Sequence, residues 1–406
     1  MKRKIFAGAV AIAAIVLSII LVQGIKYEPV PEEISTLTDT TPLRRSINAF
    51  DSYLQQNLDS SQTVGAAATI VYKDSVVFMR TSGVRRAGAA DPVTPHTVFR
   101  LASVSKGFTD VLALLLEKEG LLSIQDPVRK YIPGLQLKDS VNTADLSIHH
   151  LLNHTSGLVP HAYDNLAEAG LEIGEILPRF AEVDISAPPG ELYGYQNVLF
   201  SLFDTIASQI SGEDFSLLLQ EKIFLPLGMQ DACAGFDKLV WHPDVAFPHI
   251  RTAGGYRALP MHTGYYNLMP AAGINASISD MCRWLLALLG HVPETLGTEL
   301  LETIATPQIY TPLKRNYTRY WEKIDGRHYS FGWRIYDYKG RRIIYHGGYV
   351  RGYQAEIAFC PQEEIGLAFL QNSPNRLACQ CIPAFFNMLF TELDKPKAPS
   401  ARYSGN

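Results

Sequence analysis

The sequence predicts an α+β protein, an α/β sandwich whose single antiparallel sheet is built from both ends of the chain. Strand-forming segments lie near the start, within residues 64–80, and again near the end, within residues 329–370. Between them, residues 121–321 alternate turn-rich loops with helical stretches and contain few convincing strands. This order implies one sheet flanked by helices, with a helical subdomain inserted between its two halves.

Composition and charge exclude some classes of function. The chain has 406 residues and a net charge of -4, and charges of both signs are scattered along it. Because the sequence has neither a basic stripe nor an acidic tail, nucleic-acid binding is not expected. The five cysteines are odd in number and widely spaced, which excludes a disulfide framework or a paired-cysteine zinc motif, although one disulfide fits the count.

The N-terminus carries a candidate membrane segment. Three basic residues, Lys2 to Lys4, precede residues 5–22, which contain no charged side chain. That run approaches the roughly 17 to 25 residues that cross a bilayer, and flanking basic residues favour the cytoplasmic side. We therefore expect an uncleaved anchor with the domain outside the cytoplasm, periplasmic in a Gram-negative cell. The alternative is a signal peptide within residues 1–24 that is removed to give a secreted protein.

The rest of the chain divides into a linker, a domain and a tail. Residues 25–45 are rich in Pro, Thr and Glu and are typical of an extended linker. The domain is expected over residues 46–394 and the tail over residues 395–406. The first predicted element is a helix over residues 46–58, where apolar residues recur at helical spacing.

Further elements follow from periodicity and turn residues. In chain order they are strands over 64–71 and 76–80 around a turn at Lys73, a buried helix from Phe108 that ends at Gly120, helices over 198–210 and 279–289, strands over 329–336, 343–345, 353–359 and 365–370, and a closing helix over 382–393.

Ser103 and Lys106 are the first candidates for chemistry. They stand three residues apart at the start of the buried helix, so one helical turn would place a hydroxyl and an amine on the same face. A serine beside an amine is a nucleophile beside a base, and the N-terminal end of a helix favours developing negative charge. Ser105 fails this spacing, because Phe108 stands three residues after it. The pattern fixes only two positions and needs support from elsewhere.

Tyr195 and Asn197 form the second candidate motif, between a proline-containing loop and a helix. A tyrosine at such a junction can project into a cleft, where nearby cations would lower its pKa and make it a base. Considered alone, one of 20 tyrosines is more often a packing residue. Asn197 alone is a suitable N-cap for the following helix.

The third motif is His346-Gly347-Gly348, at the end of an apolar strand. Two glycines let a substrate backbone lie close to a strand edge, and a histidine there can contact a polar group of the substrate. The alternative is a β-bulge at the two glycines with a histidine that is satisfied within the strand.

Together and in this order, the motifs resemble those of the serine β-lactamase and penicillin-binding protein superfamily, most closely its class C-like branch of serine hydrolases and esterases. The matching signatures are Ser-x-x-Lys, then Tyr-x-Asn, then His-x-Gly in place of Lys-Thr-Gly. Residues 151–158, 224–229 and 272–280 also resemble landmarks of the family. The similarity covers roughly residues 49–390.

The resemblance implies a β-lactamase-like fold and an acyl-enzyme mechanism that requires no metal or cofactor. Ser103 would attack a carbonyl carbon. Lys106 and Tyr195 would share the proton transfer, and Asn197 would orient Lys106 and the substrate.

The resemblance also assigns the remaining contacts. The backbone N–H groups of Ser103 and Tyr349 would form the oxyanion hole, and His346 and Gly348 would contact the substrate. His154 lies in a stretch that resembles a structural turn of the family, so a Ser-His-Asp triad is not expected.

The third motif affects the expected substrate. His346 stands where relatives usually have lysine, and a histidine is only fractionally charged at neutral pH. We therefore expect a small-molecule or peptide ester or amide, with efficient penicillin hydrolysis in doubt, and residues 159–180 lining the cleft. The alternatives are a penicillin-binding sensor that is acylated with little turnover, and an inactive binding protein.

Overall fold

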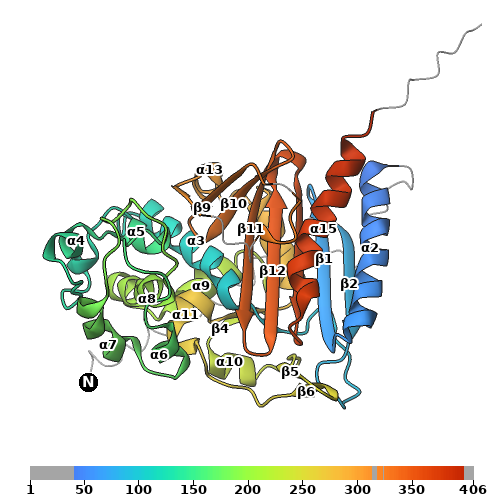
Figure 1. The fold of residues 1–406 in the computed structure, drawn as a ribbon, viewed down its shortest axis with the longest axis horizontal. Helices are drawn as coiled ribbons and strands as arrows, with labels where there is room; N and C mark the ends of the chain where they lie inside the picture. The colour runs from blue at the N-terminus through green and yellow to red at the C-terminus, as the bar shows by residue number, and fades with distance from the viewer. Residues whose placement is uncertain (1–40, 313–317, 323, 397–406) are drawn as a thin grey trace, which may run out of the picture. The chain divides into compact units, whose positions relative to one another are not determined.

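An eight-stranded antiparallel sheet organises the fold (Figure 1). The computed structural model describes residues 41–312, 318–322 and 324–396. In spatial order the strands are β2 (Ser75–Gly83), β1 (Gly65–Tyr72), β13 (Ile365–Gln371), β12 (Tyr353–Cys360), β11 (Arg341–Val350), β10 (Trp333–Tyr338), β9 (Gly326–Ser330) and β8 (Ile309–Tyr310). Because β1 pairs with β13, the N-terminal hairpin joins the C-terminal strands, which confirms the predicted sheet from both ends of the chain.

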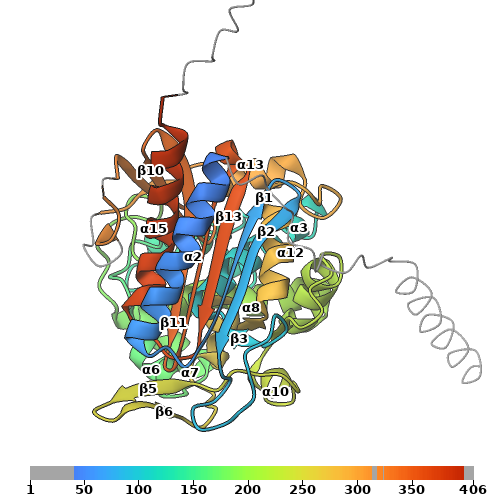
Figure 2. The same ribbon diagram turned by 90° about the vertical axis from the view of Figure 1, so that its right-hand side faces the viewer.

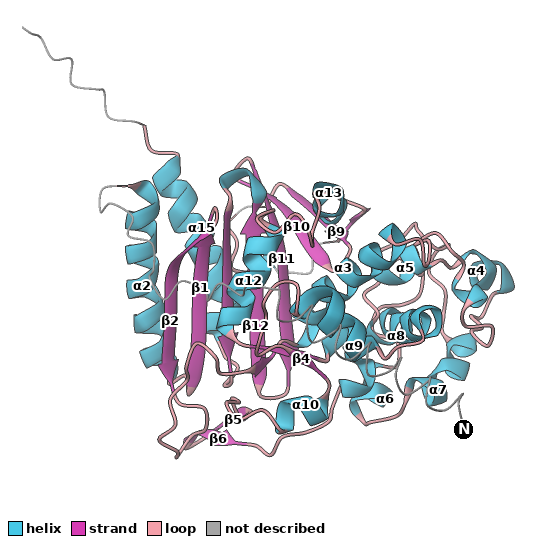
Figure 3. Ribbon diagram, turned by 180° about the vertical axis from the view of Figure 1, so that it is seen from behind, coloured by secondary structure: helices cyan, strands magenta, loops and turns pink. Residues whose placement is uncertain are grey.

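Helices cover both faces of this sheet. On one face lie α2 (Pro42–Ser61) and α15 (Arg376–Leu393), which stand side by side in Figure 2. The apolar core beneath them includes Phe50 and Phe385, whose rings meet edge to face with centroids 5.3 Å apart. On the other face, α12 (Ile278–Leu288) packs against β1 and β13 (Figure 3). Burial of each such aromatic side chain stabilises the sandwich by about 1.5–3 kcal/mol.

The middle of the chain folds mostly into helices, as predicted. Figure 1 shows helices α4 to α8, coloured teal to green, grouped at the side of the sheet away from α2. The elements of this region are α3 (Ser105–Lys118), α4 (Ser140–Asp145), α5 (Ile148–Leu152), α6 (Asp164–Glu168), α7 (Ile173–Ile176), α8 (Asn197–Ser211), α9 (Phe215–Leu219), α10 (Phe236–Val240), α11 (Met269–Ala272) and α13 (Thr298–Ala305), with short strands β3 (Phe99–Arg100), β4 (Cys233–Ala234), β5 (His249–Thr252), β6 (Gly255–Ala258) and β7 (Ile274–Ala276).

Two helices begin earlier than the sequence patterns predicted. Helix α2 starts at Pro42, inside the predicted linker, because Thr41 Oγ1 accepts a hydrogen bond from the Arg44 N–H and Pro42 suits the first helical position. Helix α15 starts at Arg376, where the Asn375 side chain accepts from the Leu377 N–H. It continues through Pro383.

The C-terminal strands also differ from their predicted bounds. The predicted strand over 329–336 is wrong: Phe331 and Gly332 both have positive φ and form a turn between β9 and β10. Strand β11 is longer than predicted and runs to Val350. Its pairing with β12 is continuous across Gly347 and Gly348, so these glycines lie inside a strand and form no bulge.

Some predicted features fall outside the described residues. These are the apolar segment 5–22, the linker up to residue 40 and the tail from residue 397. Within the described ranges, no helix has both the length and the apolar character to cross a membrane. The cysteines are all described, and each is a free thiol, so the disulfide that the count allowed is absent.

Candidate active site

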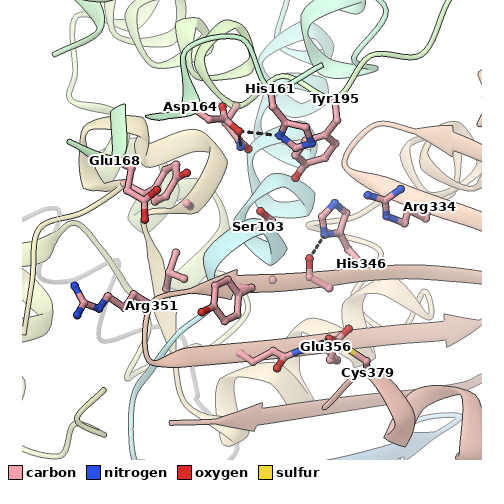
Figure 4. A pocket seen from close by; sticks show the side chains of 18 of the residues that line it. Ser103, His161, Asp164, Glu168, Tyr195, Arg334, His346, Arg351, Glu356 and Cys379 are labelled. Carbon is pink, nitrogen blue, oxygen red and sulfur yellow. Dashed lines mark hydrogen bonds and ion pairs between the residues drawn. The ribbon is translucent and has the colours of Figure 1, made fainter. Parts of the chain in front are cut away.

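Ser103 lies in a tight turn that opens onto a cleft of about 940 Å³ (Figure 4). The turn is a short 3-10 helix, Ala102–Val104, that continues directly into α3. Ala102 has a φ of 49°, a strained conformation for a residue with a side chain. Such strain is common where a fold must present a functional group, and here it places Ser103 at the end of a buried helix.

Lys106 stands one turn further along, with its amine enclosed by protein. Its Nζ donates to Asn197 Oδ1 at 2.8 Å and to the Ala271 carbonyl oxygen at 3.0 Å. Burial lowers the pKa of Lys106 from 10.5 to about 7, although the Asp164 and Asp110 carboxylates act in the opposite direction. A large fraction of this lysine is therefore a neutral amine at neutral pH, able to accept a proton.

Tyr195 lies across the cleft from Ser103, near the Lys106 amine and the Arg334 guanidinium. The centroid of its ring is 4.8 Å from Lys106 Nζ and 5.7 Å from the guanidinium carbon of Arg334. Both Tyr195 and Arg334 line the same cleft as Ser103. The structure thus places one cation, Arg334, and the Lys106 amine beside the tyrosine, and Arg334 had no signal in the sequence.

Asn197 links Lys106 to a carboxylate. The N-cap of α8 is Gln196, so Asn197 is the first residue of the helix and its side chain is available for other bonds. Its Nδ2 donates to Asp164 Oδ2 at 2.8 Å, and the same oxygen lies 2.8 Å from His161 Nδ1 (Figure 4). No spacing in the sequence pointed to Asp164 or His161 individually; both belong to the segment 159–180 that was expected to line the cleft.

His346 is buried and neutral. Its Nδ1 donates to the Gly347 carbonyl oxygen at 2.9 Å, which leaves a lone pair on Nε2, and within the described ranges no partner meets that atom. Burial holds the pKa of His346 well below 6.5, and the positive charges of Arg334 and Lys106 lower it further. At neutral pH this side chain is therefore a hydrogen-bond acceptor rather than a cation.

Gly348 brings the backbone of β11 against the Ser103 turn. A Cβ at this position would lie 2.2 Å from the Leu101 carbonyl oxygen and 2.9 Å from the Ser103 nitrogen, so only glycine fits. Tyr349 follows directly on the strand. This contact places the backbones of Ser103 and Tyr349 on one wall of the cleft, while their role as an oxyanion hole stays a prediction.

His154 and Ser105 support the site without reaching the cleft. The His154 ring lies 4.2 Å from the Tyr195 ring, and its Nδ1 accepts from the Gln196 N–H at 3.2 Å. Ser105 Oγ accepts from the Ile274 N–H at 3.0 Å inside the protein. Both placements fit the expectation that neither residue is the nucleophile or its base.

Known proteins share this sequence pattern. A family model described as Beta-lactamase matches residues 50–384. "Beta-lactamase-like protein 2" of Dictyostelium discoideum is 25% identical over 291 residues, covering 68% of this chain and 52% of that protein, so the chain spans about half the length of this relative. Esterase EstB of Burkholderia gladioli is 28% identical over 196 residues, covering 45% of this chain and 50% of that protein.

A solved structure shares the fold. The octameric penicillin-binding protein homologue from Pyrococcus abyssi matches with a TM-score of 0.73 and 26% identity, covering 84% of this chain and 77% of that chain. The three motifs that resembled a known superfamily therefore meet in one cleft, within a domain that the family model covers almost entirely. The chain belongs to the beta-lactamase family.

Proposed function

We propose that the protein is a serine hydrolase that cleaves an ester or amide through an acyl-enzyme on Ser103. The observation that carries this proposal is Lys106, whose buried amine has a pKa of about 7 and is held by Asn197 one turn from the Ser103 hydroxyl. A neutral amine that is buried away from water next to a serine can take the proton of the serine hydroxyl and so activate it as a nucleophile.

Acylation would begin with attack of Ser103 Oγ on the carbonyl carbon of the substrate. The hydroxyl proton passes to the Lys106 amine, either directly or through the Tyr195 phenol. The carbonyl oxygen becomes an oxyanion and accepts hydrogen bonds from the backbone N–H groups of Ser103 and Tyr349. When the tetrahedral species collapses, the bond to the leaving group breaks and that alcohol or amine takes the proton.

Deacylation would use the same groups in reverse. A water molecule gives a proton to the Lys106 and Tyr195 pair as its oxygen attacks the ester carbonyl of the acyl-enzyme. Collapse releases the carboxylic acid and returns the proton to Ser103 Oγ.

Because the His346 side chain is neutral, we expect the substrate group that contacts it to be neutral as well. A buried imidazole with a free Nε2 lone pair accepts a hydrogen bond but offers no positive charge to a substrate carboxylate. The similarity to a protein named an esterase supports an ester in particular. Esters, D-amino-acid amides and small peptides are thus favoured over penicillins.

One experiment tests the proposed function. Purified full-length protein and its Ser103→Ala variant are treated with a fluorophosphonate probe, p-nitrophenyl acetate and nitrocefin. Labelling and ester turnover that depend on Ser103 are the expected result. Labelling by a β-lactam without turnover would support the sensor instead, and a protein that nothing labels would contradict both functions.

We propose in addition that residues 5–22 hold the domain at a membrane, outside the cytoplasm. The support is the uncharged run behind three basic residues. The full-length protein should then stay in the membrane fraction through an alkaline carbonate wash. A mature N-terminus near Ile25 would contradict an uncleaved anchor.

A further inference from the structure

The cleft extends beyond the catalytic face of the sheet. Its lining includes Ser103 and His346, but also Tyr345, Glu356 and Cys379, none of which the proposed mechanism uses. Figure 4 shows Ser103 on one side of strand β11 and Glu356 and Cys379 on the other. Pairing between β10 and β11 ends at Arg334 and Tyr345, so the cleft can pass around the edge of β11 over residues 346–350.

Gly347 and Gly348 leave strand β11 without a side chain on each of its two faces. Successive residues of a strand point to opposite faces. At Gly348 an added Cβ would meet the Leu101 carbonyl oxygen beside the Ser103 turn, whereas at Gly347 it would lie 2.5 Å from Glu356 Oε2 and 2.7 Å from the Tyr345 hydroxyl. A glycine at position 347 therefore lets the Glu356 carboxyl and the Tyr345 hydroxyl lie directly against the backbone of β11.

Glu356 has a fixed position and an unusual environment for a carboxyl group. Only 3% of its surface is exposed. The Tyr345 hydroxyl donates to its Oε2 at 2.6 Å, and Gln354 Nε2 donates to its Oε1 at 3.1 Å. Burial raises the pKa of Glu356 to about 8, even though these two bonds, a hydrogen bond from Cys379 and the more distant Arg334 lower it.

The hydrogen bonds that hold Glu356 come from neutral side chains, those of Tyr345, Gln354 and Cys379. Each oxygen of a carboxylate can accept more than one hydrogen bond, so acceptor capacity is left over. With a pKa of about 8, Glu356 is mostly a neutral acid at neutral pH, and a bound cation would favour its ionised form through a charged hydrogen bond, which is shorter and stronger than a neutral one.

We propose that Glu356 forms a second binding subsite, which takes a primary ammonium group at the end of the acyl portion of the substrate. This inference rests on the proposed function. The ester or amide bond of the substrate lies at Ser103, its acyl chain passes the edge of β11 at Gly347, and its ammonium group donates to Glu356. The preferred substrates are therefore amino-acyl esters or amides with a chain between the amine and the carbonyl.

Paired esters test the subsite. The probes are p-nitrophenyl esters of ω-amino acids with four to eight carbons, each compared with the alkyl ester that carries a methyl group in place of the amine, such as 6-aminohexanoate against heptanoate. For at least one chain length, the wild-type protein should show a higher kcat/KM for the amino ester. Glu356→Gln should reduce that amino-to-alkyl ratio by about 10- to 100-fold, the range expected for a lost hydrogen bond to a charged group.

Two further variants control for structure. Glu364→Gln changes an exposed carboxylate at the β12–β13 turn, outside the cleft, and should keep the wild-type ratio. Gly347→Ala adds a methyl group 2.5 Å from Glu356 Oε2, so it should displace that carboxyl and lower the ratio without removing the carboxyl. It keeps the test valid if Glu356→Gln does not fold.

The outcomes separate this inference from the proposed function. If p-nitrophenyl acetate is hydrolysed in a Ser103-dependent way but no amino ester is preferred at any chain length, the subsite is refuted and the hydrolase is retained. A preference that survives unchanged in Glu356→Gln would also refute the subsite. If Ser103-dependent hydrolysis is absent altogether, the proposed function itself fails.

Discussion

Replacing Lys106 with methionine should reduce esterase activity severely while leaving the fold intact. Methionine fills much of the buried volume next to Tyr195 and Phe200 but cannot take a proton. General-base catalysis contributes about 10²- to 10⁴-fold to a rate. Since a factor of ten corresponds to about 1.4 kcal/mol, the transition state should lose about 3–5 kcal/mol of stabilisation, seen as a fall in kcat/KM.

The pH dependence gives this prediction a second readout. Burial lowers the pKa of Lys106 to about 7, the carboxylates of Asp164 and Asp110 raise it, and Arg334 lowers it. Because only the neutral amine accepts the Ser103 proton, kcat/KM for p-nitrophenyl acetate should rise with pH through about 7 and level off above it. The variant should lack this acid limb.

A matched control lies on the same helix. Lys118 is exposed in the last turn of α3, and Lys118→Met should keep both the rate and the acid limb. The assay is initial-rate hydrolysis between pH 5 and pH 9, with thermal unfolding of each variant as the check on folding. Near-normal rates in Lys106→Met, or an unchanged acid limb near pH 7, would remove Lys106 from the mechanism.

Three further changes follow from the site. Asn197→Ala should lower kcat/KM by about 10- to 100-fold, because Lys106 loses a hydrogen bond of the kind worth about 1.5–3 kcal/mol; an unchanged rate would show that Asn197 does not position the amine. Gly348→Ala should displace the Ser103 turn and reduce activity more than tenfold, whereas Gly174→Ala, where an added Cβ meets open space, should not; equal activities would argue against the tight contact. His346 has a lowered pKa in the folded protein, so its contribution to stability is complete above about pH 6.5 and is lost as pH falls below it. In urea unfolding, the wild type should therefore lose stability relative to His346→Gln between pH 6.5 and pH 5, and parallel curves would contradict this.

The sheet and its main helices could be predicted because their signals are local. Two short strand-forming segments around a Lys73 turn marked the first hairpin, and an apolar run ending at Gly120 marked α3. Errors occurred where side chains outside the pattern decide a boundary. The caps at Thr41 and Asn375 start α2 and α15 early, and the positive φ values at Phe331 and Gly332 divide one predicted strand into two.

The motif residues could be found from sequence because each motif is short and ordered, and the structure brings Ser103, Tyr195 and His346 to one cleft. The partners that tune these residues could not. Asp164 reaches the site through a hydrogen bond from Asn197, and it begins the short helix α6, for which the sequence shows no periodic pattern. Arg334 owes its role to its position on β10 beside Tyr195.

Glu356 shows the same limit more clearly. Nothing in the sequence separates it from other strand residues, and its significance depends on the strand register that sets it opposite Gly347. The placement of a buried carboxyl beside a glycine of the neighbouring strand depends on how the strands pair, and local sequence patterns do not encode that pairing.

The most direct measurement concerns the covalent intermediate itself. Full-length protein is mixed with a p-nitrophenyl ester, quenched in acid within the first turnover, and digested for peptide mass mapping. We predict an added acyl mass on Ser103 that disappears as turnover continues and is absent from Ser103→Ala. Hydrolysis that proceeds with no acyl mass, or with that mass on another residue, would contradict the acyl-enzyme mechanism.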